Sequence, residues 1–190
     1  FPGFDIYWLI SAAALLVGCT LQAALGFGMA LIAAPIIVMV KPQWVPYIMA
    51  VMALTVSLNT CWDQRTDIQW KNMLSPMIAR IPGTFTGTWL LMVMSLQHLQ
   101  IAVASMVMLS VFITMKLKPF PATTSNLGIA GFVSGITGTT TSIGGPPIAL
   151  VMQHSNGATA RANLSAFFVY SCIISIAGYH YTGLMTSETW

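Results

Sequence analysis

The stretch VSGITGTTTSIGGPPIALV, residues 133–151, decides the fold. Four glycines, a run of hydroxyl residues and two adjacent prolines stand inside an otherwise apolar sequence. Gly144-Gly145 is the most flexible pair, and Pro146 and Pro147 cannot donate backbone hydrogen bonds, so we predict that no continuous helix passes through this stretch. Broken backbone at membrane depth must line a cavity or be buried in protein. Such breaks are where membrane transporters hold their substrates.

The composition predicts a membrane protein. Of the 190 residues, 56% are hydrophobic and only 6% are charged, and the mean hydropathy is +0.79. Soluble domains carry about 25% charged residues. So few charges cannot cover a water-facing surface, and we expect an all-α polytopic membrane protein in the lipid bilayer. The net charge of +3 comes from few residues, so no nucleic-acid partner is expected, and the basic residues are interpreted as topology markers.

The apolar segments predict several membrane-embedded helices. They cover residues 5–25 with an apolar continuation to Val40, then 44–61, 72–94, 99–115, the broken stretch 126–155, and 158–182. A straight helix over 5–40 would be about 54 Å long, against about 30 Å for a bilayer core. The first segment is therefore either one span plus a partial helix or two pieces that meet at Gly26-Phe27-Gly28.

The sequence from Leu21 resembles the sequence from Val133, which predicts an internal repeat. When the two are aligned, Gly26 meets Gly138 and Pro35 meets Pro147. The basic joint KLKPFP then separates a first repeat, 1–118, from a second, 119–190. The partner of segment 72–94 would begin near residue 184, so we expect about two C-terminal helices of the second repeat to be missing from this sequence.

Charge placement leaves two topologies open. If each broken element crosses the membrane once, Arg161 and Lys41 lie on one side and the other topology-marking cations on the opposite side. If each is a re-entrant hairpin, only Lys41 opposes a shared group of five: Arg65, Lys71, Lys116, Lys118 and Arg161. The positive-inside rule favours the hairpins, which would make the two repeats inverted. The long first arm, residues 5–25, fits a hairpin less well, so both arrangements stay open.

Two arginines are candidates for holding an anion. Arg80 lies deep in segment 72–94, and an arginine at the bilayer centre costs at least about 2.5 kcal/mol, so it usually faces a cavity, a partner or an anion. The alternative is that its side chain snorkels to the interface. Arg161 follows the second broken stretch, where a guanidinium fork suits an oxyanion, and the alternative is an interfacial anchor.

The two glycine-rich breaks are the expected substrate site. A loop that opens a half-helix presents free N–H groups and a positive dipole end, and hydroxyl side chains add neutral donors. The alternative is that threonine and serine hydroxyls merely satisfy broken backbone. The predicted substrate-binding residues are Gln22, Gly26, Phe27, Gly28, Arg80, Thr139, Thr140, Thr141, Ser142, Gly144, Gly145 and Arg161.

Other site classes lack a motif. The three cysteines are far apart and lie in apolar runs, and the three histidines are isolated, so we expect no metal and no cofactor. The aspartates are peripheral and no phosphate-binding loop is present, so we do not expect an enzyme.

Both glycine–proline loops, GFGMALIAAP from Gly26 and SGITGTTTSIGGPPIAL from Ser134, resemble the TauE/SafE sulfite and sulfonate exporter family. Arg80-Ile81-Pro82-Gly83 with Gly87, and Arg161, extend the resemblance over most of the chain. The resemblance implies about eight membrane segments in a duplicated arrangement, from which this sequence departs by ending early. It also implies transport of small sulfur-containing anions such as sulfite, thiosulfate and organosulfonates.

We therefore expect a secondary transporter of such an anion, with the substrate between the two breaks. An anion channel, or a membrane scaffold or delivery subunit, remains the alternative. The expected location is the cell membrane with several crossings, the inner membrane if the protein is bacterial. The expected partners are a small anionic substrate, lipid and, as an open option, a second copy in a homodimer.

Overall fold

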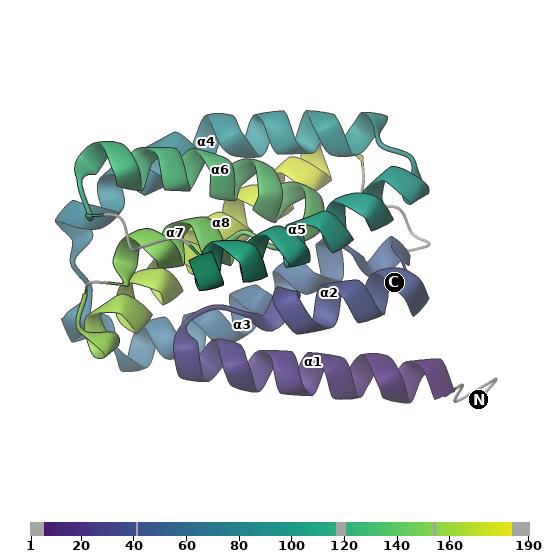
Figure 1. Cartoon of the computed structure of the whole chain (residues 1–190), viewed down its shortest axis with the longest axis horizontal. Helices are drawn as coiled ribbons and strands as arrows, with labels where there is room; N and C mark the ends of the chain where they lie inside the picture. Colours follow the sequence, from purple (N-terminus) through teal and green to yellow (C-terminus); the bar gives the residue numbers. More distant parts are fainter. Residues whose placement is uncertain (1–5, 41, 117–120, 154, 184–190) are drawn as a thin grey trace.

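The computed structural model describes residues 6–40, 42–116, 121–153 and 155–183, and every regular element in these ranges is helical (Figure 1). The elements are α1 (Ile6–Leu25), α2 (Met29–Val40), η1 (Pro42–Trp44), α3 (Tyr47–Asp63), η2 (Arg65–Asp67), α4 (Trp70–Val93), α5 (Leu96–Lys116), α6 (Thr124–Thr141), α7 (Gly145–Met152) and α8 (Gly157–Tyr181). This confirms the all-α class, and the expected segments match these helices within a few residues.

Length and polarity fit a membrane protein. By length and composition, the described residues contain three helices able to cross a bilayer, namely α1, Leu96–Ile113 of α5, and α8, while α2 is a shorter apolar helix. Large apolar side chains such as Leu16 and Phe85 are exposed, whereas Ser134, Thr139 and Arg80 are buried. Apolar residues outside and polar residues inside reverse the usual soluble pattern. The polytopic membrane class is therefore confirmed.

The first broken element is a hairpin. The helix α2 starts beside the middle of α1, because a Cβ on Gly18 would lie 2.9 Å from the carbonyl oxygen of Met29. Near the start of α1, the ring centroid of Trp8 lies 4.7 Å from that of Trp44, which follows the end of α2. The chain therefore crosses in α1 and returns in α2 to the end where it began. The length of α1 is no obstacle, because only the 12 residues of α2 form the returning arm.

The second broken element is also a hairpin. Its short helix α7 begins beside the middle of α6, where Ser134 Oγ donates a hydrogen bond to the Gly144 carbonyl at 2.5 Å. It then runs back along α6, so that Ile148 and Val151 share a core cluster with Leu127. Of the two topologies that the sequence leaves open, the structure has the re-entrant one.

The two hairpins point in opposite directions, and α1 and α6 enter the bundle from opposite ends (Figure 1). Each break is three residues long, and its first residue has a left-handed backbone, φ 82° at Gly26 and φ 64° at Ser142. Gly26 therefore corresponds to Ser142. The expected pairing with Gly138 is wrong, because Gly138 lies inside α6 as a packing residue against Arg80 and Gly144.

The expected repeat boundary at residues 118 and 119, and the expected absence of helices from residue 184, fall outside the described residues.

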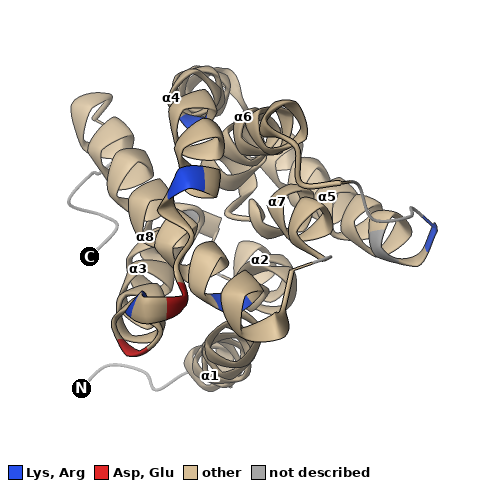
Figure 2. Ribbon diagram, turned by 90° about the vertical axis from the view of Figure 1, so that its left-hand side faces the viewer, with Lys and Arg blue, Asp and Glu red and all other residues tan. Residues whose placement is uncertain are grey.

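Charges gather at one end of the bundle, which we call the charged end. Three contacts define it: Gln69 N to Asn163 Oδ1 at 2.8 Å, Ser75 Oγ to the Thr124 carbonyl at 2.7 Å, and Arg161 Nη1 to the Ala24 carbonyl at 3.4 Å. Figure 2 views the molecule from this end, and the start of α1 and the end of α8 lie at the opposite end in Figure 1. The described charged residues that belong to this end are Asp63, Arg65, Asp67, Lys71, Lys116 and Arg161.

Glycines bring α4 and α6 into close contact. A Cβ on Gly131 would lie 2.6 Å from the Cα of Pro76, and a Cβ on Gly135 would lie 2.8 Å from the Cα of Gly83. Only hydrogen atoms fit between the backbones at these positions. The contact holds the middle of α4, which carries Arg80, against the second hairpin.

Candidate functional site

The two half-helices α2 and α7 begin at the same place in the interior. The break before α2 touches the start of α7, because a Cβ on Gly145 would lie 2.9 Å from Phe27 Cδ2. A helix N-terminus carries a partial positive charge and N–H groups without intrahelical partners. Two such ends therefore face one interior point, an arrangement that suits an anion.

Arg80 is buried beside this point. Its side chain is 3% exposed, and Nη1 donates to the Ser134 carbonyl at 2.8 Å and to Ser134 Oγ at 2.9 Å. Nη2 lies 3.4 Å from Ser175 Oγ, the guanidinium carbon is 5.4 Å from the Phe167 ring centroid, and Nε has no partner. The arginine therefore does not snorkel. Its partners in the described residues are neutral, so its positive charge is not balanced by a carboxylate there.

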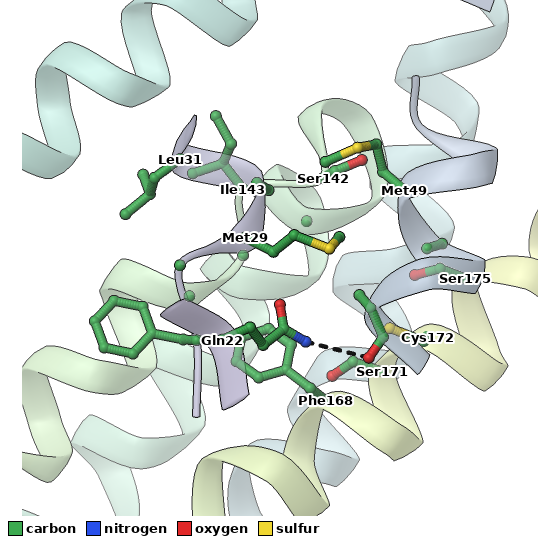
Figure 3. A pocket seen from close by; sticks show the side chains of 18 of the residues that line it. Gln22, Met29, Leu31, Met49, Ser142, Ile143, Phe168, Ser171, Cys172 and Ser175 are labelled. Atoms are coloured by element: carbon green, nitrogen blue, oxygen red, sulfur yellow. Dashed lines mark hydrogen bonds between the residues drawn. The ribbon is translucent and has the colours of Figure 1, made fainter. Parts of the chain in front are cut away.

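A cavity of about 40 Å³, the central cavity, opens next to these groups. A single water needs roughly 10–15 Å³ measured in this way, so the central cavity has room for a ligand of a few atoms. Both breaks, α3, α4, α6 and α8 contribute to its wall. Figure 3 shows side chains from α1, α2, α3, the second break and α8 arranged around it.

The structure brings seven of the predicted site residues together around this cavity. These are Gln22, Phe27, Gly28, Arg80, Ser142, Gly144 and Gly145. Gln22 spans from α1 to α3, where its Nε2 donates to Ser57 Oγ at 2.9 Å and to the Ala53 carbonyl at 3.1 Å. Gly26 does not line the cavity, and it packs instead against the backbone of Arg161.

The threonine run was expected in a loop, and the structure corrects this. Thr139, Thr140 and Thr141 form the last turn of α6 and do not line the central cavity. Thr140 Oγ1 donates to the Ile136 carbonyl at 2.9 Å and Thr141 Oγ1 to the Thr137 carbonyl at 2.7 Å, within their own helix. Thr139 Oγ1 lies 3.2 Å from Ser175 Oγ and so supports a partner of Arg80.

Arg161 lies apart from Arg80. It lines a second cavity, of about 550 Å³, at the charged end, together with residues of α1, α7 and the start of α8. The expectation that both arginines serve one site is therefore not met by this geometry.

The cavity residues that sequence reasoning missed include Met29, Met49, Ser171, Cys172 and Ser175. They stand in regular helices without a motif. The spacing of Ser171 and Ser175 was an available signal, because residues four apart share a helix face. No three His, Cys, Asp or Glu side chains gather as a metal site in the part of the chain that the structure describes.

Comparisons with known proteins give one result. No curated protein matches the chain, and no solved structure matches it. The family model described as sulfite exporter TauE/SafE matches residues 10–190, a range that includes both hairpins, Arg80 and the central cavity. The chain therefore belongs to the sulfite exporter TauE/SafE family of membrane transporters.

Proposed function

We propose that the protein is a secondary transporter of small sulfur-containing anions and that it holds its substrate in the central cavity. The observation that carries the proposal is Arg80, a buried guanidinium whose partners in the described residues are all neutral. A buried unpaired charge is costly unless it is compensated. A bound anion supplies that compensation, and emptying the site restores the cost, which favours rebinding.

The donors around the cavity suit an oxyanion. Gly144 and Gly145 carry N–H groups at the start of α7, whereas Pro146 and Pro147 carry none. The guanidinium of Arg80 offers a planar fork of charge-assisted donors. Together these groups provide fixed, neutral and cationic donors around one small ligand.

The size and wall of the cavity favour the smaller members of this substrate class. A space of about 40 Å³ suits sulfite or thiosulfate better than a longer organosulfonate. Met29, Met49 and Cys172 add polarizable sulfur atoms to the wall. Transport then follows from movement of one hairpin repeat against the other.

Charge placement supports an orientation. Four of the five described basic residues lie at the charged end, and the fifth, Arg80, lies in the middle of α4. Under the positive-inside rule we assign this end to the cytoplasm. We place the protein in the cell membrane as a multi-pass protein, the inner membrane in a bacterium.

Uptake into proteoliposomes tests the proposal. The wild-type protein is expected to take up radiolabelled sulfite at a rate that saturates with sulfite concentration. The uptake rate of Arg80→Leu is expected to be at least about tenfold lower, since a charge-assisted contact contributes roughly 1.5–3 kcal/mol. Arg80→Lys keeps the charge without the fork and should fall between the two. The matched control is Arg65→Leu, an exposed arginine of the charged end, which should retain the wild-type rate.

The other outcomes are also informative. Flux that rises without saturation would identify an anion channel. Saturable uptake that is unchanged in a folded Arg80→Leu protein would place the substrate elsewhere. No uptake of any sulfur anion by folded wild-type protein would favour a scaffold or delivery subunit.

A further inference from the structure

The large cavity at the charged end, which we call the vestibule, adjoins the central cavity. The vestibule is lined by Ala24 and Leu25 at the end of α1, by residues of α7, and by the first residues of α8. In the described chain, the residue that lines both cavities is Phe27. A ligand that passes from one to the other must therefore pass this side chain.

The backbone on each side of Phe27 is unusual. Gly26 and Gly28 have φ angles of 82° and 112°, which L side chains rarely adopt. A Cβ on Gly28 would meet no atom within 4 Å, so packing does not require glycine there and the backbone conformation does. The phenyl ring thus stands between two glycines, which leave the backbone freer to turn than any other residue would.

The ring rests on the start of the opposite half-helix. A Cβ on Gly145 would lie 2.9 Å from Phe27 Cδ2 and 3.2 Å from Phe27 Cβ. Glycine at position 145 therefore makes the space that the ring occupies. The contact is between the two breaks and is apolar, so separating it costs no hydrogen bond.

Arg161 gives the vestibule its charge. The lining side chains of the vestibule include this one cation and no carboxylate in the described residues. Its Nη1 makes a long contact of 3.4 Å with the Ala24 carbonyl, and its Nε has no partner. A guanidinium has five donors, so most of them remain for an anion. A cation in a cleft also raises the local concentration of anions.

We propose that the vestibule is the entry site of the substrate, where Arg161 binds the anion, and that Phe27 is the gate between this site and the central cavity. The proposal rests on the proposed function. The anion reaches Arg161 first, the ring leaves Gly145 as the glycines turn, and the anion moves on to Arg80. Ile143, the middle residue of the other break, is 2% exposed and packed in a core cluster, so in this conformation the route leads to the charged end.

Cysteine labelling tests the gate. Cys172 lines the central cavity and not the vestibule, and Cys19→Ser with Cys61→Ser leaves it as the only thiol of the chain. In this background, Phe27→Ala is expected to speed labelling of Cys172 by an anionic methanethiosulfonate by about tenfold or more, because the barrier at the ring is removed. The matched control is Phe168→Ala, which removes a ring that lines only the central cavity and should change the rate far less.

A pair of reagents tests the role of Arg161. Arg161→Gln is expected to slow labelling by the anionic reagent by about tenfold and to leave labelling by a neutral methanethiosulfonate unchanged. Equal rates for Phe27→Ala and Phe168→Ala would overturn the gate. Equal effects of Arg161→Gln on both reagents, or no effect on either, would overturn the entry site.

The labelling measures access to Cys172 and not transport, and its anionic reagent carries a carboxylate instead of a sulfonate. Its outcome is therefore separate from that of the uptake experiment. A gate found in a protein that does not take up sulfite would leave the route in place and reject the substrate. Sulfite uptake that depends on Arg80, without the labelling differences, would keep the function and reject the route.

Discussion

The two hairpins share one plan and differ in how firmly they are held. In each, a long helix ends in a three-residue break and a short helix begins at mid-depth. The second hairpin is covered by α4, and Ser134 ties α6 to the start of α7 through the Gly144 carbonyl. The first has α1 with most of its surface exposed and a break with two left-handed glycines.

We interpret this difference as a difference in the roles of the two hairpins. Ser134 also accepts a hydrogen bond from Arg80, so the firmly packed hairpin holds the charged group of the site in place. The first hairpin, whose long helix α1 is mostly exposed, carries Phe27 at the contact between the breaks. This difference is compatible with the proposed function, in which one repeat moves against the other.

The largest effect is expected where α4 meets α6. Gly131→Ala would place a methyl group on the backbone of Pro76, so we expect a loss of about 1–3 kcal/mol or more in unfolding free energy. Alanine has the higher helix propensity, so a loss can only come from the contact. Denaturation of the detergent-solubilised protein measures it. Gly157→Ala, at the start of α8 with no atom within 4 Å, is the control, and equal stabilities would disprove the tight contact.

A smaller loss is expected at the tie within the second hairpin. Ser134→Ala removes the hydroxyl, which is one of the acceptors of Arg80 and the donor to the Gly144 carbonyl, so we expect a cost of about 1–3 kcal/mol. Ser11→Ala on α1 is the control, because Ser11 Oγ is buried without a partner among the described residues and its removal should not destabilise the protein. The two variants are compared by thermal unfolding. If Ser11→Ala lowered the stability as much as Ser134→Ala does, the hydroxyl of Ser134 would not stabilise the second hairpin more than that of Ser11 stabilises the first.

A pure backbone effect is expected at the first break. Gly28→Ala meets no neighbouring atom, but its φ of 112° is strained for alanine, so we expect a cost of about 1–2 kcal/mol. Thermal unfolding checks this value. An unchanged unfolding temperature of Gly28→Ala would mean that the backbone at residue 28 relaxes to a negative φ.

The smallest effect is expected at the corresponding position of the second break. Ser142→Gly relieves a left-handed serine with φ 64°, but it also makes the unfolded chain more flexible. The two terms oppose each other, so we expect a change within about 0.5 kcal/mol. The same unfolding measurement tests it, and a loss above 1 kcal/mol would show that the serine hydroxyl matters more than its long 3.4 Å contact with the Pro46 carbonyl indicates.

The sequence was sufficient to predict the helical membrane class, both breaks and the position of Arg80 in the interior beside a cavity. These follow from strong local costs, since prolines and adjacent glycines interrupt helices and a buried arginine is expensive. The register of the repeat could not be predicted in this way. Gly138 allows close packing on Arg80, whereas Gly26 allows a left-handed turn, and residue type alone does not distinguish the two uses.

The rest of the site depends on distances that the sequence does not contain. The threonines before Ser142 remain helical because their hydroxyls bond to carbonyls one turn earlier. Arg161 lies in another cavity because α8 starts at the charged end, whereas α2 and α7 start at mid-depth. Met29 and Cys172 reach the central cavity from regular apolar helices, where nothing local distinguishes them from packing residues.

The most direct measurement is the position of a bound substrate analogue in a crystal. Selenite has the charge and shape of sulfite, and its selenium atom scatters anomalously. The expected result is an anomalous peak in the central cavity, within hydrogen-bond distance of the Arg80 guanidinium and of the N–H groups at the start of α7. A peak that occupies only the vestibule beside Arg161, at a selenite concentration that inhibits sulfite uptake, would contradict a binding site at Arg80.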